Sequence, residues 1–440
     1  MTDAISSGPS VHTPPDLGAD RPVARPDTGV KAKIKQFILD HIDVFVAPLR
    51  DFAPILILKK KNLAVVTRYD DVKEVFLADD AFGVPYAPKL TLLTGGVPFL
   101  LGMENSQAYR DSLKAWQDVF RLVPGTEAAD VKTRLVPATE AAAERIVAAS
   151  HGRVDTIELA SQASLEVFLD YFGIPAPADG DIGLWSERLF EWLFRVGKPE
   201  PQMDADAAAY SKALLAHVER VIAARKASGE KKDDILGRCL QKQAESKPGF
   251  SDTEIRSMLA GFIIAGPPQP PVVLPKVMEQ LLRRPKILAE AQDAARRNDD
   301  ETLGKYVFEA MRFDPLAPFL QRIAKRQHVL GDGTFHVKTI ERGTQVAFFV
   351  ASAMMDDRRV SSPKSFDPNR PRHHYFLFGH GLHRCFGLHI NEKLLPLILK
   401  PLLQRKGLRR ASGPAGHLRK RLIYPEKLDV CFDEEPVVHQ

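Results

Sequence analysis

The fold of this 440-residue chain is decided by the stretch Phe378-Gly379-His380-Gly381-Leu382-His383-Arg384-Cys385-Phe386-Gly387. Its glycines let the main chain pack closely against a flat group and adopt positive φ, because glycine has no Cβ. A helical pattern of apolar residues follows Gly387. We therefore expect the positive end of that helix to lower the pKa of the Cys385 thiol. Cys239 and Cys431 lack such surroundings and are interpreted as inert thiols.

An aromatic residue, glycines, a cysteine and a glycine two positions later together resemble the haem-binding signature of the cytochrome P450 family. In that family a cysteine thiolate is the axial ligand of the haem iron. The resemblance implies a mostly α-helical P450 fold with a smaller β part, over residues 31–440 as a single haem domain. It also implies one haem b whose iron is bound by Cys385. The other residues of the signature that it places against the haem are Phe378, Gly379, His383 and Gly387.

Upstream residues extend the resemblance. Glu309 and Arg312 lie one turn apart on a predicted helix, where oppositely charged side chains meet. They look like the Glu-x-x-Arg pair of the family, which implies a structural ion-pair network with Arg370. Arg322 follows on a predicted strand and resembles a second contact to a haem propionate.

The central helix departs from the family pattern. Oxygen-activating members carry an acid and a threonine there, and this chain has Ala265-Gly266-Pro267-Pro268-Gln269-Pro270-Pro271. Pro268 takes the place of the acid and Gln269 that of the threonine. Five prolines fall within the nine residues 267–275. Each costs ~3 kcal/mol or more inside a helix, so we expect the helix to break over the haem. The candidate catalytic residues are Gln269, Gly266 and Ala265.

Gln269 can form hydrogen bonds but cannot titrate, which makes it a poor proton relay. One explanation is that ordered water relays protons instead. The other is that the enzyme starts from a peroxide or hydroperoxide, as a peroxygenase or as a rearranging enzyme (isomerase or dehydratase) without an electron donor. A thiolate-haem binding protein without turnover is a further alternative to a monooxygenase.

A second departure concerns the propionates. Many family members have a histidine and an arginine at positions that align with Ala108 and Ser112. Arg110 is our candidate replacement for this haem contact, with Lys114 and Trp116 as alternatives.

The predicted pocket is apolar, which favours an apolar small organic substrate. We expect six apolar side chains in particular to line it: Leu93, Val97, Phe99, Ile264, Phe319 and Leu320. Oxidising equivalents would come from a soluble ferredoxin-type electron donor with dioxygen, or from a peroxide. The basic stretch 417–421 is interpreted as an exposed loop, with docking of an acidic electron donor as the alternative.

Composition excludes several other classes. The 61 Lys and Arg against 56 Asp and Glu give a net charge of +5 without clustering, so nucleic-acid binding is not expected. Three separated cysteines favour the reducing cytoplasm over a disulfide framework. We find no run that approaches the ~18 apolar residues of a membrane span. Residues 1–30 are rich in Pro, Gly, Asp and Ser, and we expect a disordered tail.

Apolar spacing places most of the chain in helices. The predicted strands are 55–58, 63–67, several within 327–350, and 428–432, and residues 88–103 are expected to be irregular. The predicted helices cover residues 69–77, 108–121, 131–149, 157–172, 183–196, 207–227, 252–265, 274–284 and 285–298, with a last one from about 387.

Overall fold

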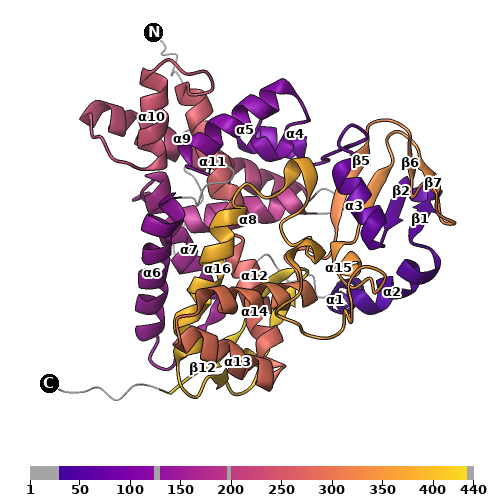
Figure 1. Cartoon of the computed structure of the whole chain (residues 1–440). Coiled ribbons are helices and arrows are strands. Elements are labelled where there is room, and N and C mark those ends of the chain that lie inside the picture. The colour runs from indigo at the N-terminus through magenta and orange to yellow at the C-terminus, as the bar shows by residue number, and fades with distance from the viewer. Residues whose placement is uncertain (1–28, 123–128, 196–199, 434–440) are drawn as a thin grey trace, which may run out of the picture.

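The computed structural model describes residues 29–122, 129–195 and 200–433. The tail expected over residues 1–30 lies almost wholly outside these ranges. The described part is mostly helical, with the largest sheet and the β6–β7 pair on one side and β12 apart from them among the helices (Figure 1). Its α-helices are α1 (Val30–Asp40), α2 (Ile42–Phe52), α3 (Tyr69–Leu77), α4 (Ala87–Leu93), α5 (Gln107–Val119), α6 (Val136–Ala148), α7 (Thr156–Phe172), α8 (Ile182–Phe194), α9 (Pro201–Ser228), α10 (Ile235–Ala244), α11 (Asp252–Ala265), α12 (Pro270–Leu282), α13 (Pro285–Arg296), α14 (Asp300–Phe313), α15 (Val350–Ala353) and α16 (Leu388–Gln404).

The largest sheet has the strand order β1-β2-β8-β5-β3. The β1–β2 hairpin turns through Asn62, whose φ of 48° is left-handed and which is followed at once by β2. β2 pairs parallel with β8, and the other neighbours are antiparallel. The bounds of these strands are β1 (Ile55–Leu58), β2 (Leu63–Val66), β3 (Phe82–Gly83), β5 (Leu320–Ala324) and β8 (Gln345–Phe348).

Three smaller sheets complete the β part. β12 lies between β4 and β9, whereas β6 pairs with β7 and β10 pairs with β11, all antiparallel. Their bounds are β4 (Arg153–Asp155), β6 (His328–Leu330), β7 (Lys338–Ile340), β9 (Arg409–Arg410), β10 (Arg419–Arg421), β11 (Tyr424–Lys427) and β12 (Asp429–Cys431).

The main apolar core lies among the helices. α6 packs on α7 and α16, and α12 packs on α7 and α14. α11 begins with a capping box, in which the Ser251 side chain accepts from the Glu254 backbone N–H and the Glu254 carboxylate accepts from the Ser251 backbone. A second, smaller core fills the space around the largest sheet and α3.

The segment Asp252–Leu282 is long enough to cross a membrane, and it contains an 18-residue window with a mean hydropathy of 1.2. Our expectation that no run reaches this length is therefore wrong for α11 and α12 together. However, 83% of that window is buried inside the protein. A buried core helix can have the same length and composition as a membrane span, and this segment is mostly buried.

Most predicted helices are found within a few residues of their expected ends, and the 252–265 helix agrees at both ends. α1, α2 and α10 were not predicted. α4 was also missed, because we interpreted Pro88 as a breaker. Pro88 occupies the first turn of α4. A backbone N–H in the first turn has no partner within the helix, so proline loses no helical hydrogen bond there.

A buried network joins α14 to the segment that precedes the cysteine loop. Both Glu309 oxygens bind Arg312, at 2.6 and 2.9 Å, and Arg370 Nε lies 3.4 Å from the same carboxylate. Tyr375 Oη donates to Glu309 at 2.9 Å, and Asp367 N donates at 3.0 Å. The structure thus brings Glu309, Arg312 and Arg370 together in an interior where these charges are fully shielded from water.

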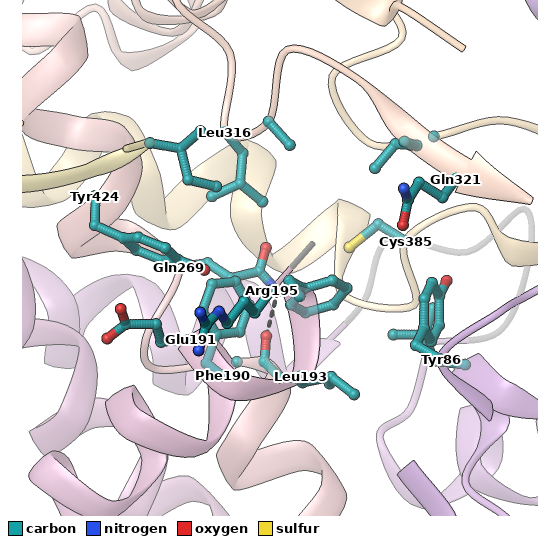
Figure 2. A pocket seen from close by; sticks show the side chains of 18 of the residues that line it. Tyr86, Phe190, Glu191, Leu193, Arg195, Gln269, Leu316, Gln321, Cys385 and Tyr424 are labelled. Carbon is teal, nitrogen blue, oxygen red and sulfur yellow. Dashed lines mark hydrogen bonds between the residues drawn. The ribbon is translucent and has the colours of Figure 1, made fainter. Parts of the chain in front are cut away.

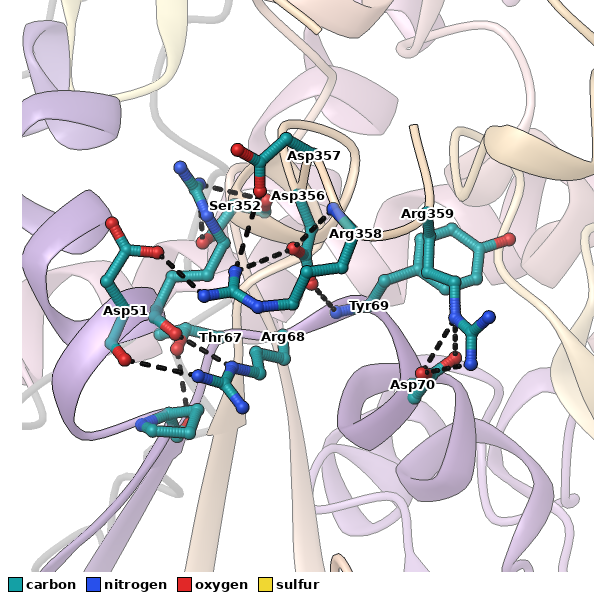
Figure 3. Close-up of polar contacts among 12 residues, drawn as sticks. Asp51, Thr67, Arg68, Tyr69, Asp70, Ser352, Asp356, Asp357, Arg358 and Arg359 are labelled. Carbon is teal, nitrogen blue, oxygen red and sulfur yellow. Dashed lines mark hydrogen bonds and ion pairs between the residues drawn. The ribbon is translucent and has the colours of Figure 1, made fainter. Parts of the chain in front are cut away.

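A second polar network ties the N-terminal helices to the end of α15 (Figure 3). Buried Asp356 accepts from Tyr69 N and from Arg358, each at 3.0 Å. Arg358 also pairs with Asp51 at 3.2 Å, and Arg68 donates to the Asp51 carbonyl at 3.1 Å. These contacts join the end of α2 and the start of α3 to the segment that follows α15.

Replacement of Glu309 tests the buried network. Glu309→Gln leaves Arg312 and Arg370 buried without a counter-charge, which should cost about 3–5 kcal/mol of unfolding free energy. The matched control is Glu301→Gln, which removes an exposed pair with Lys305 on the same helix and should cost under about 0.5 kcal/mol. Thermal unfolding of the two purified proteins compares them. Equal shifts in both variants would show that the network does not stabilise the fold.

Candidate active site

A cavity of about 1060 Å³ lies between the helical part and the largest sheet. This volume slightly exceeds the ~300–1,000 Å³ that is typical of pockets for drug-sized ligands. Its walls come from the α8 helix, the α11–α12 junction, β5, the cysteine loop and the β10–β11 hairpin. The space is therefore large enough for a flat macrocycle and a small molecule together.

The cysteine loop forms one wall of this cavity. Cys385 N donates to Phe378 O at 2.8 Å, which closes the loop on itself just before α16. Gly381 has a φ of 67°, and a Cβ there would lie 2.7 Å from the Phe76 carbonyl oxygen. Glycine is thus required at this position for both conformation and space. Of the three cysteines, all of which are described, only Cys385 lines the cavity.

Electrostatics at Cys385 differ from our expectation. Burial raises the pKa of its thiol to about 11, and the Gly387 N–H, the Asn391 amide and Arg384 only partly oppose this. The prediction that the helix end lowers this pKa is therefore wrong in net direction, because desolvation outweighs it. A cation against the sulfur would supply the missing stabilisation, as metal binding does for a ligating thiol. These surroundings fit a metal ligand.

Two basic side chains line the same cavity near this loop. Arg322 is buried on β5, donates to Gln321 O at 2.9 Å, and has no carboxylate partner within the described ranges. Burial, and then the charge of Arg322, lower the pKa of His383 to about 4. A buried cation without a counter-charge is costly, so anionic groups of a bound cofactor are suitable partners. The two haem propionates fit this requirement.

Arg110 does not fit its predicted role. It is exposed, and its guanidinium binds Asn105 at 2.7 Å and Gln107 instead of lining the cavity. Lys114 is exposed too, and Trp116 is buried outside the cavity lining.

Tyr109 on the same helix does line the cavity, and its hydroxyl donates to Leu382 O at 2.7 Å. The sequence contained a signal for it. Tyr109, Leu113 and Phe120 repeat with helical spacing, which places them on one face, and all three line the cavity.

The central helix breaks as predicted. α11 ends at Ala265 and α12 begins at Pro270. The Gln269 side-chain amide donates to Ala265 O, and Gln269 N donates to Gly266 O at 3.2 Å. Buried Ser164, on α7, donates to Pro267 O at 2.9 Å. Side chains and a tightened turn thus satisfy carbonyls that the prolines leave without a helical donor.

The three candidate catalytic residues Ala265, Gly266 and Gln269 all line the cavity. Among the predicted pocket residues, Phe99, Phe319 and Leu320 line it as well. Leu93, Val97 and Ile264 do not. Ile264 is fully buried on the opposite face of α11 from Phe262 and Ala265, and Leu93 is fully buried in the main core.

A polar end of the cavity was missed. Lys420 and Arg421, from the stretch interpreted as an exposed loop, line the cavity together with Tyr424. Glu191 on α8 is buried beside them, and Arg421 Nη2 binds it at 2.7 Å. Only the pairing of α8 with the hairpin reveals this cluster, since more than 200 residues separate its members in the sequence.

Comparison with known proteins identifies the family. The sequence model described as Cytochrome P450 matches residues 189–408, which is half of the chain. Mycinamicin IV hydroxylase/epoxidase from Micromonospora griseorubida is 24% identical over 367 residues, 81% of this chain and 85% of that protein. Linoleate diol synthase from Gaeumannomyces graminis is 38% identical over 80 residues, 18% of this chain and 7% of that protein. The first two curated relatives are matched over 36% and 32% of their own lengths.

Solved structures agree on the fold. P450BioI, crystallised with an acyl carrier protein ligated to hexadec-9Z-enoic acid, aligns with a TM-score of 0.75 at 17% identity. The alignment covers 91% of this chain and all of that one. Together, the family match over half the chain, the shared fold and a half-buried cysteine at the cavity wall show that this chain belongs to the cytochrome P450 family, whose cofactor is haem.

Proposed function

We propose that this chain is a haem-thiolate enzyme that oxidises an apolar small molecule, with Cys385 as the axial ligand. The carrying observation is that Cys385, alone among the three cysteines, lines the cavity, on a loop closed by the hydrogen bond from Cys385 N to Phe378 O. Phe378, Gly379 and Gly387 would pack against the macrocycle, and Arg322 and His383 would hold its propionates. Bound haem supplies a redox-active iron whose thiolate ligand favours O–O cleavage.

The chain's own residues provide a largely apolar cavity. Most of its lining is aliphatic or aromatic, including Phe99, Phe172, Phe262 and Phe319. Such walls hold an apolar substrate and exclude water from the reacting group. We place the haem domain at residues 31–440. The cysteine usage of the chain leads us to place the protein in the cytoplasm.

We further propose that the oxidant is a peroxide, because the proton relay of oxygen-activating relatives has no counterpart at the helix break. Pro268 is buried and has no ionisable group, and Gln269 directs its amide to Ala265 O. The Ser164 hydroxyl reaches the break from α7, but it donates its hydrogen bond to Pro267 O. A peroxide needs no electron donor, because it already carries the two electrons that dioxygen would have to take from a donor.

A rearranging activity on an organic hydroperoxide is the second candidate. The observation that favours it is the same missing relay, since a hydroperoxide carries its own O–O bond and the reaction is an isomerisation or dehydration. Likeness to a linoleate diol synthase over 80 residues supports a substrate with a fatty-acyl chain. A ferredoxin-type donor remains the partner only if dioxygen is the oxidant.

The oxidant can be tested directly on the haem-loaded protein. Hydrogen peroxide, an organic hydroperoxide, and a ferredoxin pair with reduced nicotinamide under air are supplied separately with a panel of apolar substrates. We expect product with at least one peroxide, and with the electron donor only about as much as the hydrogen peroxide it releases can explain. Well-coupled turnover with the donor in the presence of catalase would contradict the peroxide assignment, and indifference to every oxidant would favour a binding protein.

Restoring the relay provides a second test. The double variant Pro268→Asp with Gln269→Thr supplies the missing acid and hydroxyl. We expect donor-driven turnover to rise by about tenfold or more, since a positioned proton donor contributes up to about 10²–10⁴-fold. Pro268→Asp with Gln269→Val is the matched control, because valine has the shape of threonine without its hydroxyl. Equal rates for the two variants would show that the hydroxyl is not what the wild type lacks.

Replacement of the ligand tests the haem assignment. Cys385→Ser removes the thiolate, so the absorption band of the reduced carbon monoxide complex that marks thiolate ligation should disappear. Cys431→Ser is the control, since Cys431 lies on β12 away from the cavity lining. It should keep its haem content and its spectrum. An unchanged spectrum in Cys385→Ser would refute Cys385 as the ligand.

A further inference from the structure

Large apolar side chains of α1 are exposed to solvent along one face of the helix. Val30, Ile34 and Phe37 are 74%, 54% and 56% exposed, and their spacing of four and three residues places them on the same side. The Phe37 ring centroid lies 6.2 Å from that of exposed Phe45 on α2, so this apolar face continues onto the next helix. Contiguous exposed apolar groups of this kind mark contact sites, whereas single ones are ordinary.

The other side of α1 is fixed on the β10–β11 hairpin. The Gln36 side-chain amide donates to Leu422 O at 3.1 Å, and its oxygen accepts from Leu422 N at 2.6 Å. Asp40 pairs with Lys420 of the same hairpin at 3.2 Å. The helix is therefore anchored with its apolar face turned outward.

This anchoring places α1 at one end of the cavity. Tyr424, on the same hairpin, lies on the side of the cavity away from Cys385 (Figure 2). Gln36 and Leu39 line the cavity from α1. One side of the helix thus borders the cavity, while the apolar face is presented to solvent.

Lys33 and Lys35 flank the apolar face of α1. Both are exposed, and neither pairs with a carboxylate among the described residues. Both also line the cavity, so they lie at the border between the apolar face and the cavity. Asp40 is the only acidic residue of α1, and Lys420 already neutralises it. An exposed apolar face bordered by free lysines is suited to the interface of an anionic bilayer.

Two other occupants of this face are less suitable. A twofold contact between two copies of the chain would bring Lys33 and Lys35 of both copies together, and like charges repel. The sequence before α1 offers aliphatic residues singly, among prolines and polar residues, at Ile5, Val11, Leu17 and Val23. Such a sequence has no apolar run that would match the face.

We propose that α1 and the start of α2 form a docking surface for an anionic phospholipid bilayer. Val30, Ile34 and Phe37 enter the interfacial layer, and Lys33 and Lys35 lie against the lipid head groups. The inference goes beyond the proposed function and depends on neither the oxidant nor the substrate. It brings one end of the cavity next to the bilayer, so an apolar molecule dissolved in lipid reaches that end without crossing bulk water.

Flotation of the full-length haem protein with lipid vesicles tests this inference. The vesicles consist of phosphatidylcholine alone, or of equal parts phosphatidylcholine and phosphatidylglycerol, each at low and at high salt. We expect at least about tenfold tighter binding to the anionic vesicles, and we expect high salt to remove this preference. Lys33→Gln with Lys35→Gln should lower the affinity for anionic vesicles by about 10- to 30-fold and leave that for neutral ones within about twofold.

The apolar face is tested by Ile34→Gln with Phe37→Gln, which should lower the affinity for both kinds of vesicle at least about tenfold. Leu92→Gln is the matched control. Leu92 is 58% exposed on α4, which lies well apart from α1 in Figure 1, and its replacement should change the affinity by less than about twofold. An unchanged spectrum of the reduced carbon monoxide complex verifies that each variant retains its folded haem site.

Absence of binding to anionic vesicles, equal affinity for neutral and anionic vesicles, or unchanged binding after replacement of Ile34 and Phe37 would overturn the inference. Sedimentation of the wild type as a dimer that the same double variant dissociates would overturn it too, because a second copy would then cover the face. Binding that requires removal of residues 1–28 would assign the face to that segment instead. No oxidant is present, so these results are independent of whether peroxide-driven turnover is found.

Discussion

The position of Cys385 at the wall of a largely apolar cavity is the constraint on which the rest of this structure depends. Desolvation raises the pKa of the Cys385 thiol, and a cation against the sulfur would lower it. The start of the cysteine loop is held by a hydrogen bond to the ion-pair network. Tyr375, three residues before Phe378, donates to the buried Glu309 carboxylate, which also binds Arg312. The ion-pair network and the cofactor site are thus parts of one arrangement.

The cavity wall at the α11–α12 junction is shaped by prolines, which have no backbone N–H to continue a helix. Prolines remove N–H groups from the central helix, and the Ser164 hydroxyl and the Gln269 backbone N–H supply replacement donors to Pro267 O and Gly266 O. The helix break is therefore a satisfied and ordered structure. Its side chains serve the backbone, which leaves no acid–alcohol pair at the point where relatives relay protons. An oxidant that brings its own O–O bond avoids the need for that relay.

Sequence reasoning recovered the parts governed by local rules. The helix break followed from proline chemistry, and the cysteine loop from its glycines and the helix behind it. Features that depend on distant segments were missed. Ile264 proved to face the core, and Arg110 pointed to solvent while Tyr109 faced the cavity. The sign of the Cys385 pKa shift also failed, because burial is a property of the whole fold.

The central claim is that oxygen reaches the product from a peroxide because the helix break carries no relay. Mass spectrometry of products formed with isotopically heavy hydrogen peroxide under ordinary air, and with ordinary peroxide under heavy dioxygen, measures this directly. The account predicts heavy oxygen in the product from labelled peroxide and none from labelled dioxygen. Label taken from dioxygen, in a reaction driven by an electron donor and unaffected by catalase, would contradict it.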